Sequence, residues 1–446
     1  MSPSGVETCG TMSPLDQNET SCIIQFKESL SLELMPSDER RNWEKRSIYK
    51  VRPCIANLNS KAYQPQVVSF GPYHHGKDCL HPMEEHKRRA LRHFLKRSGK
   101  PLECFFKSLR EVAQVLEESY EELDPNWKVG SSGDAACQFL KLLITDGCFM
   151  LEILRAGPQQ VTQAEQEKDD YADDDPIFSK HGKLHVMPYI RRDMLMLENQ
   201  LPMLVLDRLV AVESDGKKGD QFINDLILKF FSSPSKVTSK CLHVLDVYRK
   251  SLLPPENEVQ DKLPKGSRGL IWSATELHEH GIQFKKSGTT SLKDISFERG
   301  VLKLPEISVD DTTESAYLNL IAFEHCHAGV GNEVTSYIYF MEKIIDKEGD
   351  VALLEARDII QNGMGSDQAV AQVFNSLGKE VTLEPESSLD AVQNQVSDYC
   401  KKAWYTWGAT LWNTHFESPW SITSFIAAIL LFGLAIIQTV YTVLYP

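Results

Sequence analysis

The spacing of hydrophobic positions predicts a chain built mainly from helices. Apolar residues recur every three or four positions in several long segments, which is the period of one face of an α-helix. Residues 106–123 have this pattern, and from 139 to 154 nearly every position is apolar, which predicts a buried central helix that carries Lys141, Asp146 and Glu152. Further helices are expected around 83–95, 188–212, 220–231, 238–253, 314–328, 333–346, 350–361, 367–377 and 388–413.

One region departs from the helical period. Residues 281–284, 292–297 and 301–304 are short runs in which apolar and polar side chains alternate, as they do in strands, and glycine-containing turns separate them. The pattern predicts one small antiparallel β-meander. The expected fold is therefore mainly α, or α+β in the loose sense, with a multi-helix domain, this meander and a C-terminal transmembrane helix.

The same pattern suggests how the chain is divided. Residues 1–21 are polar and predict a disordered N-terminal tail, and 22–47 predict an amphipathic arm. The helical domain is expected over 48–413. A segment of about 400 residues exceeds what one hydrophobic core usually serves, so we expect two closely packed subdomains. No linker rich in Pro, Gly or Ser marks a boundary between them.

The C-terminal segment has the pattern of a membrane span. No charged residue occurs from Ile422 to Leu444. As a helix this stretch would reach about 34 Å, enough to cross a hydrocarbon core of about 30 Å. Trp420 and Tyr445 flank it, as aromatic side chains do at membrane interfaces. We expect a transmembrane helix over 420–445 that anchors the chain in a lipid bilayer, and the alternative is a helix buried in a soluble core.

Charge limits the class of partner. The chain has 48 Lys and Arg against 62 Asp and Glu, a formal net charge of −14. Nucleic acids are bound by clustered cations, so we expect no nucleic-acid partner. The longest charged block, between 165 and 175, is acidic and predicts a solvated loop.

The cysteines and the N-terminus bear on the compartment. Ten cysteines are scattered without a C-x-x-C pair, which favours reduced thiols. The first twenty residues lack the apolar core of a secretory signal. We therefore expect a single-pass membrane protein with most of the chain in the cytosol, and either the plasma membrane or an endomembrane fits.

Several sequence blocks are similar to those of a plant family. In chain order they are Ile48–Pro53, Val68–Gly76, Asp146–Phe149, Leu197–Pro202, Ser273–Leu277, Asn319–Glu324 and Pro419–Trp420. Together they resemble the family known as domain of unknown function two-four-seven, from about Ile48 to the C-terminus. The resemblance implies a plant origin, a single C-terminal membrane segment and no accepted catalytic residues. Certain grass members are associated with pollen-side self-incompatibility, which suggests recognition of another protein.

Two of these blocks place polar residues among apolar ones. Asp146 lies beside Cys148 in the apolar central helix, where a carboxylate is either a paired structural charge or a tuned acid. The structural role is favoured, with Arg, Lys or backbone N–H groups as partners, because an unpaired buried carboxylate is costly. Glu198, Asn199 and Gln200 precede Pro202, and we expect their side chains to bond to neighbouring backbone and hold a helix break.

The sequence contains few patterns of known chemistry. His74–His75, His278–His280 and Glu324–His327 contain potential metal ligands, but two ligands on one helical face are too few for tetrahedral zinc. The sequence has no phosphate-binding loop, dinucleotide loop or G-x-S-x-G elbow. We assign no catalytic, cofactor-binding or metal-binding residue and expect no cofactor.

These observations favour a single-pass, membrane-anchored plant protein that binds an unidentified protein in recognition or signalling, without enzymatic activity. The candidate structural or binding residues are Asp146, Glu198, Asn199 and Glu324, and the anchor is marked by Trp420, Ile422 and Leu444. Two alternatives stay open. One is an uncharacterised enzyme with a site near Asp146, Glu198 and His325, and the other is a membrane-associated scaffold.

Overall fold

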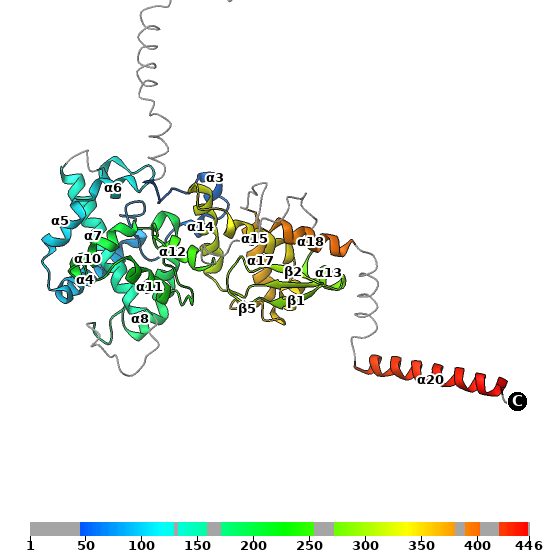
Figure 1. Cartoon of the computed structure of the whole chain (residues 1–446). Helices are drawn as coiled ribbons and strands as arrows, with labels where there is room; N and C mark the ends of the chain where they lie inside the picture. The colour runs from blue at the N-terminus through cyan, green and yellow to red at the C-terminus, as the bar shows by residue number, and fades with distance from the viewer. Residues whose placement is uncertain are drawn as a thin grey trace, which may run out of the picture. The chain divides into compact units, whose positions relative to one another are not determined.

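The computed structural model describes residues 45–128, 133–157, 171–253, 272–379, 389–401 and 419–444. The chain divides into two compact units, Met1–Arg46 and Ser47–Pro446. Every element named below belongs to the second unit (Figure 1). The tail expected at 1–21 and nearly all of the arm expected at 22–47 lie outside the described residues.

The first half of this unit is helical. The longest amphipathic helix, α4, has Pro82 in its first turn, and it ends where Gly99 takes a left-handed conformation and donates its N–H to Leu95. The helices are α3 (Pro53–Ala56), α4 (His81–Ser98), α5 (Leu102–Arg110), α6 (Ala113–Glu118), α7 (Gly133–Ala156), α8 (Lys180–His185), α9 (Met187–Asp193), α10 (Met203–Glu213), α11 (Asp220–Phe230) and α12 (Val244–Ser251), with 3-10 turns η1 (Ser60–Tyr63), η2 (Asp78–Leu80), η3 (Pro125–Trp127) and η4 (Leu197–Asn199).

The central helix predicted from the apolar run is confirmed as α7. Between Phe139 and Leu154 every residue except Lys141 and Thr145 is buried, including Asp146. Helix α4 packs along α7, and α10, α11 and α5 also contact it. A helix that is apolar on nearly all sides needs neighbours on nearly all sides, and α7 has them.

The second half combines helices with short strands. A capping box between Ser273 and Glu276 begins α13. The elements are α13 (Ala274–Glu279), β1 (Gln283–Lys286), β2 (Ser296–Glu298), β3 (Val301–Leu304), β4 (Ile307–Val309), α14 (Thr313–Cys326), α15 (Glu333–Ile344), α16 (Glu348–Glu355), β5 (Ile360–Asn362), α17 (Asp367–Gly378) and α18 (Asp390–Cys400).

The predicted antiparallel meander is wrong in its topology. β2 and β3 form an antiparallel hairpin, closed by Arg299 and Gly300 with positive φ, but β1 pairs with β3 in parallel and the strand order is β1-β3-β2. The connection of residues 287–295 is too long for a tight hairpin, so β2 does not pair with β1, and β3 lies between them.

A second sheet was missed. Strands β4 and β5 pair in parallel, with Ile307 opposite Ile360. The helix expected over 350–361 therefore ends early, at Glu355 in α16. Asp358 takes a positive φ, and the buried Ile359 and Ile360 lead into β5. A short buried run of this kind does not show by its period alone whether it is strand or helix.

Several expected helices are divided or shorter than predicted. The amphipathic run of 106–123 is divided between α5 and α6, and α6 ends at Glu118. The segment 188–212 is divided into α9, η4 and α10, with extended backbone at Gln200 and Pro202 before α10. The segment 238–253 contains only α12. The segment 388–413 contains α18, and residues 402–413 lie outside the described residues.

Two hydrophobic cores fill the unit. The N-terminal core is built on α4, α5, α7, α10 and α11, and the C-terminal core on the strands and α14 to α17. Three segments contribute nearby residues to both. Ile48, Leu201 and Val244 belong to the N-terminal core. Their near neighbours Tyr49, Leu197 and Leu245 belong to the C-terminal core. We call the place where these three segments meet the core junction.

The C-terminal segment forms helix α20 (Pro419–Leu444), drawn in red in Figure 1. Trp420, Ile422 and Leu444 all lie within it. A helix was expected here, and it was expected to span a membrane over 420–445. Among the residues that the structure describes, none of the helices has both the length and the apolar content to cross a bilayer, so the structure does not support that assignment.

Candidate functional site

Asp146 forms a buried ion pair with Lys87. Both side chains are fully buried, and Lys87 Nζ lies 2.8 Å from Asp146 Oδ1. The other carboxylate oxygen accepts the Gly71 N–H at 2.9 Å, and the ammonium group also contacts Glu84 at 2.7 Å and the Ser69 hydroxyl at 3.2 Å. Burial raises the pKa of Asp146, and Lys87 opposes the rise. The carboxylate therefore ties the 69–71 loop to α4 and α7.

Gly71 explains why this loop can approach so closely. It has a φ of +73°, and a Cβ there would lie 2.9 Å from both Gln200 O and the Tyr120 hydroxyl oxygen. A residue with a side chain would be strained by its backbone and would also displace these neighbours. Glycine at position 71 thus lets the backbone N–H of this loop donate to the Asp146 carboxylate.

Asn199 and Gln200 use their amide groups to satisfy backbone at the break before α10. Asn199 accepts the Phe70 N–H at 2.7 Å and donates to Val68 O at 3.0 Å. Gln200 donates to Met194 O and accepts from the Leu245 N–H. Both side chains are fully buried. Their partners come from three different segments, so the amides hold the core junction together as well as the helix break.

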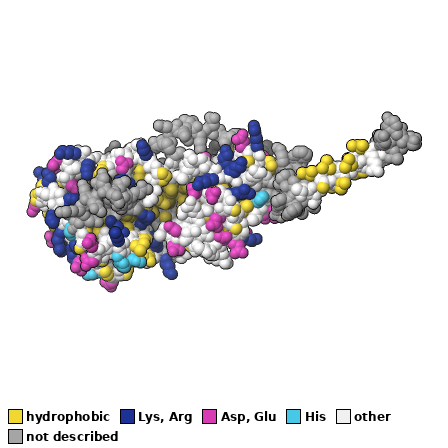
Figure 2. Space-filling model, turned by 90° about the horizontal axis from the view of Figure 1, so that it is seen from below, with side chains coloured by type: hydrophobic (Ala, Val, Ile, Leu, Met, Phe, Trp, Pro, Cys, Tyr) yellow, Lys and Arg dark blue, Asp and Glu magenta, His cyan; other side chains and the backbone are white. Residues whose placement is uncertain are grey.

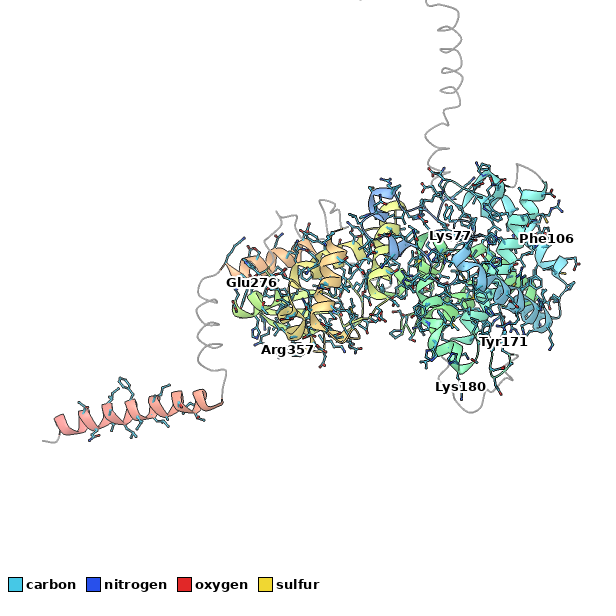
Figure 3. The ribbon with its side chains drawn as sticks, turned by 180° about the vertical axis from the view of Figure 1, so that it is seen from behind. Lys77, Phe106, Tyr171, Lys180, Glu276 and Arg357 are labelled. Carbon is cyan, nitrogen blue, oxygen red and sulfur yellow. The ribbon has the colours of Figure 1, made fainter. Side chains whose placement is uncertain are left out.

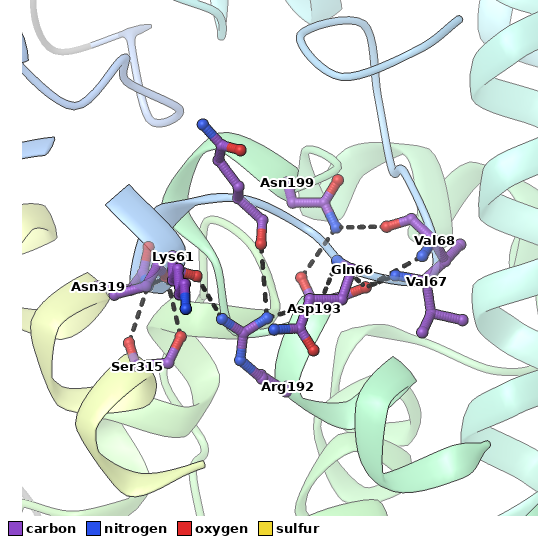
Figure 4. Close-up of polar contacts among 11 residues, drawn as sticks. Lys61, Gln66, Val67, Val68, Arg192, Asp193, Asn199, Ser315 and Asn319 are labelled. Atoms are coloured by element: carbon purple, nitrogen blue, oxygen red, sulfur yellow. Dashed lines mark hydrogen bonds and ion pairs between the residues drawn. The ribbon is translucent and has the colours of Figure 1, made fainter. Parts of the chain in front are cut away.

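Asp193, at the end of α9, was not recognised from the sequence. Its carboxylate accepts the N–H groups of Gln66, Val67 and Val68, at 2.7 to 3.1 Å (Figure 4). Burial raises its pKa while these three bonds oppose the rise. Its neighbour Arg192 donates to Lys61 O. No sequence pattern near Asp193 could have identified partners more than 120 residues away.

Glu198 links three segments at the core junction. One oxygen accepts the Val51 N–H at 2.8 Å, and the other lies 3.4 Å from Nε2 of His74. His74 is buried, and among the described residues its Nδ1 has no hydrogen-bond partner. The expectation that Glu198 bonds to its neighbouring backbone is wrong, because Val51 lies 147 residues earlier in the chain.

Glu324 caps α15. Its carboxylate accepts the N–H groups of Val334 and Thr335 and forms a buried ion pair with Arg249 at 2.7 Å. Asp146 is fully buried, whereas His325, the residue after Glu324, is exposed.

Two of the histidines noted in the sequence have hydrogen-bond partners within the folded unit. His327 Nδ1 lies 2.8 Å from the Tyr49 hydroxyl, and His280 Nδ1 contacts Glu276 O at 2.7 Å. Within the described ranges, no group of three or more His, Cys, Asp and Glu residues could hold a metal ion. Glu324 and His327, which share one face of a helix, therefore have no third metal ligand among the described residues.

The cysteines at these places are not activated. Burial raises the pKa of Cys148 well above its ordinary value and that of Cys326 to about 11. Both thiols are therefore protonated at neutral pH and are weak nucleophiles. The polar groups of the core junction act by joining distant backbone segments, and their hydrogen bonds are used in building the fold.

Comparison with known proteins gives two relatives and one family. The family model DUF247, described as plant protein of unknown function, matches residues 48–434. UPF0481 protein At3g47200 of Arabidopsis thaliana is 31% identical over 436 residues, covering 89% of this chain and 86% of the relative. Putative UPF0481 protein At3g02645 of the same plant is 22% identical, covering 94% of each chain. No solved structure matches the chain.

Proposed function

Because the chain belongs to the DUF247 family of plant proteins of unknown function, we propose that it is a membrane-tethered module that binds another protein, in recognition or signalling. The proposed role is not enzymatic. Helix α20 is the tether, the folded unit before it lies in the cytosol, and the partner is a protein. The names of the relatives state no activity, so the proposal depends on this chain's own surface.

The exposure of apolar side chains on α20 carries the proposal. Large hydrophobic residues on this helix are half to three-quarters exposed, among them Leu431 at 67% and Phe432 at 71%, and they form the yellow stretch in Figure 2. Exposed apolar area costs about 25 cal/mol per Å² relative to burial, so such a helix is more stable in lipid or against a partner. The absence of any charged residue from 422 to 444 favours lipid.

A binding face is available on α8 and α9. Leu184 is 68% exposed and Tyr189 is 51% exposed, on two short helices that contact each other. Exposed tyrosine side chains are common anchors at protein interfaces, and an exposed aliphatic side chain near one adds apolar contact area. Arg191, on the same segment, lies over the rings of Phe230 and Phe231 and donates to Phe230 O, which holds α9 in place.

Tethering would strengthen a weak contact. A domain confined to a membrane surface meets partners on the same surface at a raised effective concentration. A modest apolar face around Leu184 and Tyr189 can then be sufficient for binding.

The tether is tested by carbonate extraction of plant cells that express tagged variants. The first variant is truncated after Ser418 and so lacks α20, which begins at Pro419. The second is L430R/L431R, which places two charges in the apolar stretch. Each arginine at the centre of a span costs about 2.5–3.5 kcal/mol on insertion scales. A matched control, L430A/L431A, keeps the segment uncharged.

The full chain and the alanine control are expected in the membrane pellet, and the truncated and arginine variants in the supernatant. The arginine variant distinguishes lipid insertion from loss of a whole segment, because it keeps every residue of α20 but two. If the full chain is itself in the supernatant, or if the truncated and arginine variants both stay in the pellet, the tether is refuted.

The orientation needs its own measurement. An epitope near Ser4 should resist external protease in intact cells if the folded unit is cytosolic. Digestion of the epitope while a cytosolic marker stays intact would overturn the cytosolic placement. This result is independent of whether α20 inserts in the membrane.

The binding role is tested by proximity labelling with the full chain. L184E/Y189S removes the two anchors and keeps α20, and it is compared with K77S, a substitution outside α8 and α9 (Figure 3). The full chain and K77S should label the same proteins, and L184E/Y189S should lose them. If all three chains label the same set as an α20-only control, the binding proposal fails.

A further inference from the structure

Helix α8 presents two histidines side by side on the surface. His181 and His185 are four residues apart, and their ring centroids lie 4.5 Å from each other with an interplanar angle of 48°. Both side chains are exposed. Among the described residues neither ring has a hydrogen-bond or ion-pair partner, so the ring nitrogens are available. This pair is independent of the core junction and of α20.

The backbone that carries this pair is held rigidly. Ser179 caps α8 by accepting the Gly182 N–H at 3.2 Å. A Cβ at position 182 would lie 2.5 Å from backbone atoms of Pro176 and Ile177, so only glycine permits this close packing. Asp175, which is buried, accepts the Ile177 N–H at 2.8 Å. The first turn of α8 is therefore fixed against the segment before it.

A second anchor lies further from the pair. Asp175 also forms an ion pair with Arg89 of α4 at 3.0 Å, and Phe178 stacks on Tyr171 with ring centroids 3.9 Å apart. Figure 3 labels Lys180, the first residue of α8, and Tyr171 in the same part of the unit. A rigid support matters because each ligand then loses less conformational entropy when it binds.

Imidazoles at positions i and i+4 of a helix point to the same side and can bind one metal ion together, as in the two histidines of H-E-x-x-H helices. Neutral imidazole suits Cu²⁺, Ni²⁺ and Zn²⁺, and the affinity order at a given site places Cu²⁺ above Zn²⁺. We propose that His181 and His185 form a two-histidine chelate site for one divalent transition-metal ion, with water in its remaining coordination positions.

The nearby charges limit the affinity without preventing binding. Lys180 and Lys183 on the same helix repel a cation, whereas the exposed Asp173 and Asp174 precede it in the chain. Exposed charges are screened within about 8–10 Å at physiological ionic strength, so these contributions are small.

The test is a titration of the full chain in a mild detergent, with its exposed thiols alkylated so that they neither bind nor reduce the metal. Cu²⁺ and, separately, Zn²⁺ are added, and binding is followed by calorimetry and, for Cu²⁺, by electron paramagnetic resonance. The variants are H181A, H185A and the exchange K183H/H185K. The exchange keeps the composition and the number of histidines, but it places the two imidazoles at i and i+2, where they point in different directions.

We expect the tightest Cu²⁺ site to hold one ion per chain, to bind Cu²⁺ more tightly than Zn²⁺, and to show two coordinated nitrogens in the resonance spectrum. Each alanine variant and the exchange should weaken this binding about tenfold or more. Far-UV circular dichroism should be unchanged, which separates loss of the site from loss of the fold. Equal Cu²⁺ affinity in the wild type and the exchange, or no binding by the wild type, would overturn the proposal.

Discussion

Replacing Lys87 with methionine should destabilise the protein by about 3–5 kcal/mol, the usual cost of removing one partner of a buried ion pair. Lys87 and Asp146 are both fully buried and 2.8 Å apart. Without the ammonium group, the Asp146 carboxylate keeps only the Gly71 N–H at 2.9 Å, and Glu84 loses its contact at 2.7 Å. Methionine has nearly the same length, so the loss reports on charge and not on a large cavity.

The loss should depend on pH in a stated direction. Burial already raises the pKa of Asp146, and Lys87 opposes that rise, so K87M should raise the pKa further. A carboxyl whose pKa is higher in the folded state than in the unfolded state binds more protons when folded. Its penalty is therefore fully present above the raised pKa and decreases as the pH falls. The K87M loss should be smaller at about pH 5 than at about pH 8.

Urea unfolding of the full chain, followed by tryptophan fluorescence, measures these losses. The control is K96M, which changes an exposed lysine of the same helix and should alter stability by less than about 0.5 kcal/mol. In K87M/D146N the amide can still accept the Gly71 N–H and no charge remains at the fully buried position 146, so about 1–3 kcal/mol should be recovered, while Glu84, which is partly exposed, still lacks its ammonium partner. The single variant D146N completes the comparison. If K87M loses no more stability than K96M, or if the loss of K87M/D146N equals the sum of the K87M and D146N losses, the ion-pair argument is refuted.

Three further predictions concern other buried groups. N199A should cost about 2–4 kcal/mol in urea unfolding, because it leaves the Phe70 N–H and other buried backbone groups unpaired, and a loss under about 1 kcal/mol would contradict this. Burial lowers the pKa of His243 to about 4, against about 6.5 when unfolded, so the unfolded state binds more protons between these values. The free energy of unfolding should therefore rise by about 3 kcal/mol as the pH rises across that window, and H243Q should remove most of this rise. The same pH dependence in the wild type and in H243Q would contradict the prediction. G147A should cost about 1–3 kcal/mol, because the new Cβ would lie 2.6 Å from Leu209 Cδ1, and an unchanged thermal midpoint would disprove the close packing.

Some of these buried polar contacts could be predicted from the sequence. Asp146 stands in an apolar helix, so a cationic or backbone partner was expected, and both are present. Asn199 and Gln200 were expected to hold a helix break, and their amides do bond to backbone there. In each case a polar residue in apolar surroundings signalled the need for a partner.

Other contacts could not be predicted. Asp193 looks like an ordinary polar residue at a helix end, and its three N–H partners lie at 66–68. The spacing of His181 and His185 is visible in the sequence, but Gly182 between them disfavours the helix that would bring the two rings together. That glycine is required by its contact with Ile177, which only the folded chain reveals.

The sequence by itself determined that the chain is mainly helical, that α7 is buried, and that the last part of the chain is apolar and uncharged. These properties follow from the period and composition of neighbouring residues, which act over a few residues at a time. Only the tertiary structure decided that β1 pairs with β3 in parallel, and that Ile48 and Tyr49 enter different cores. Such choices depend on the shape and hydrogen-bonding groups of residues far away in the chain, and a local pattern does not contain them.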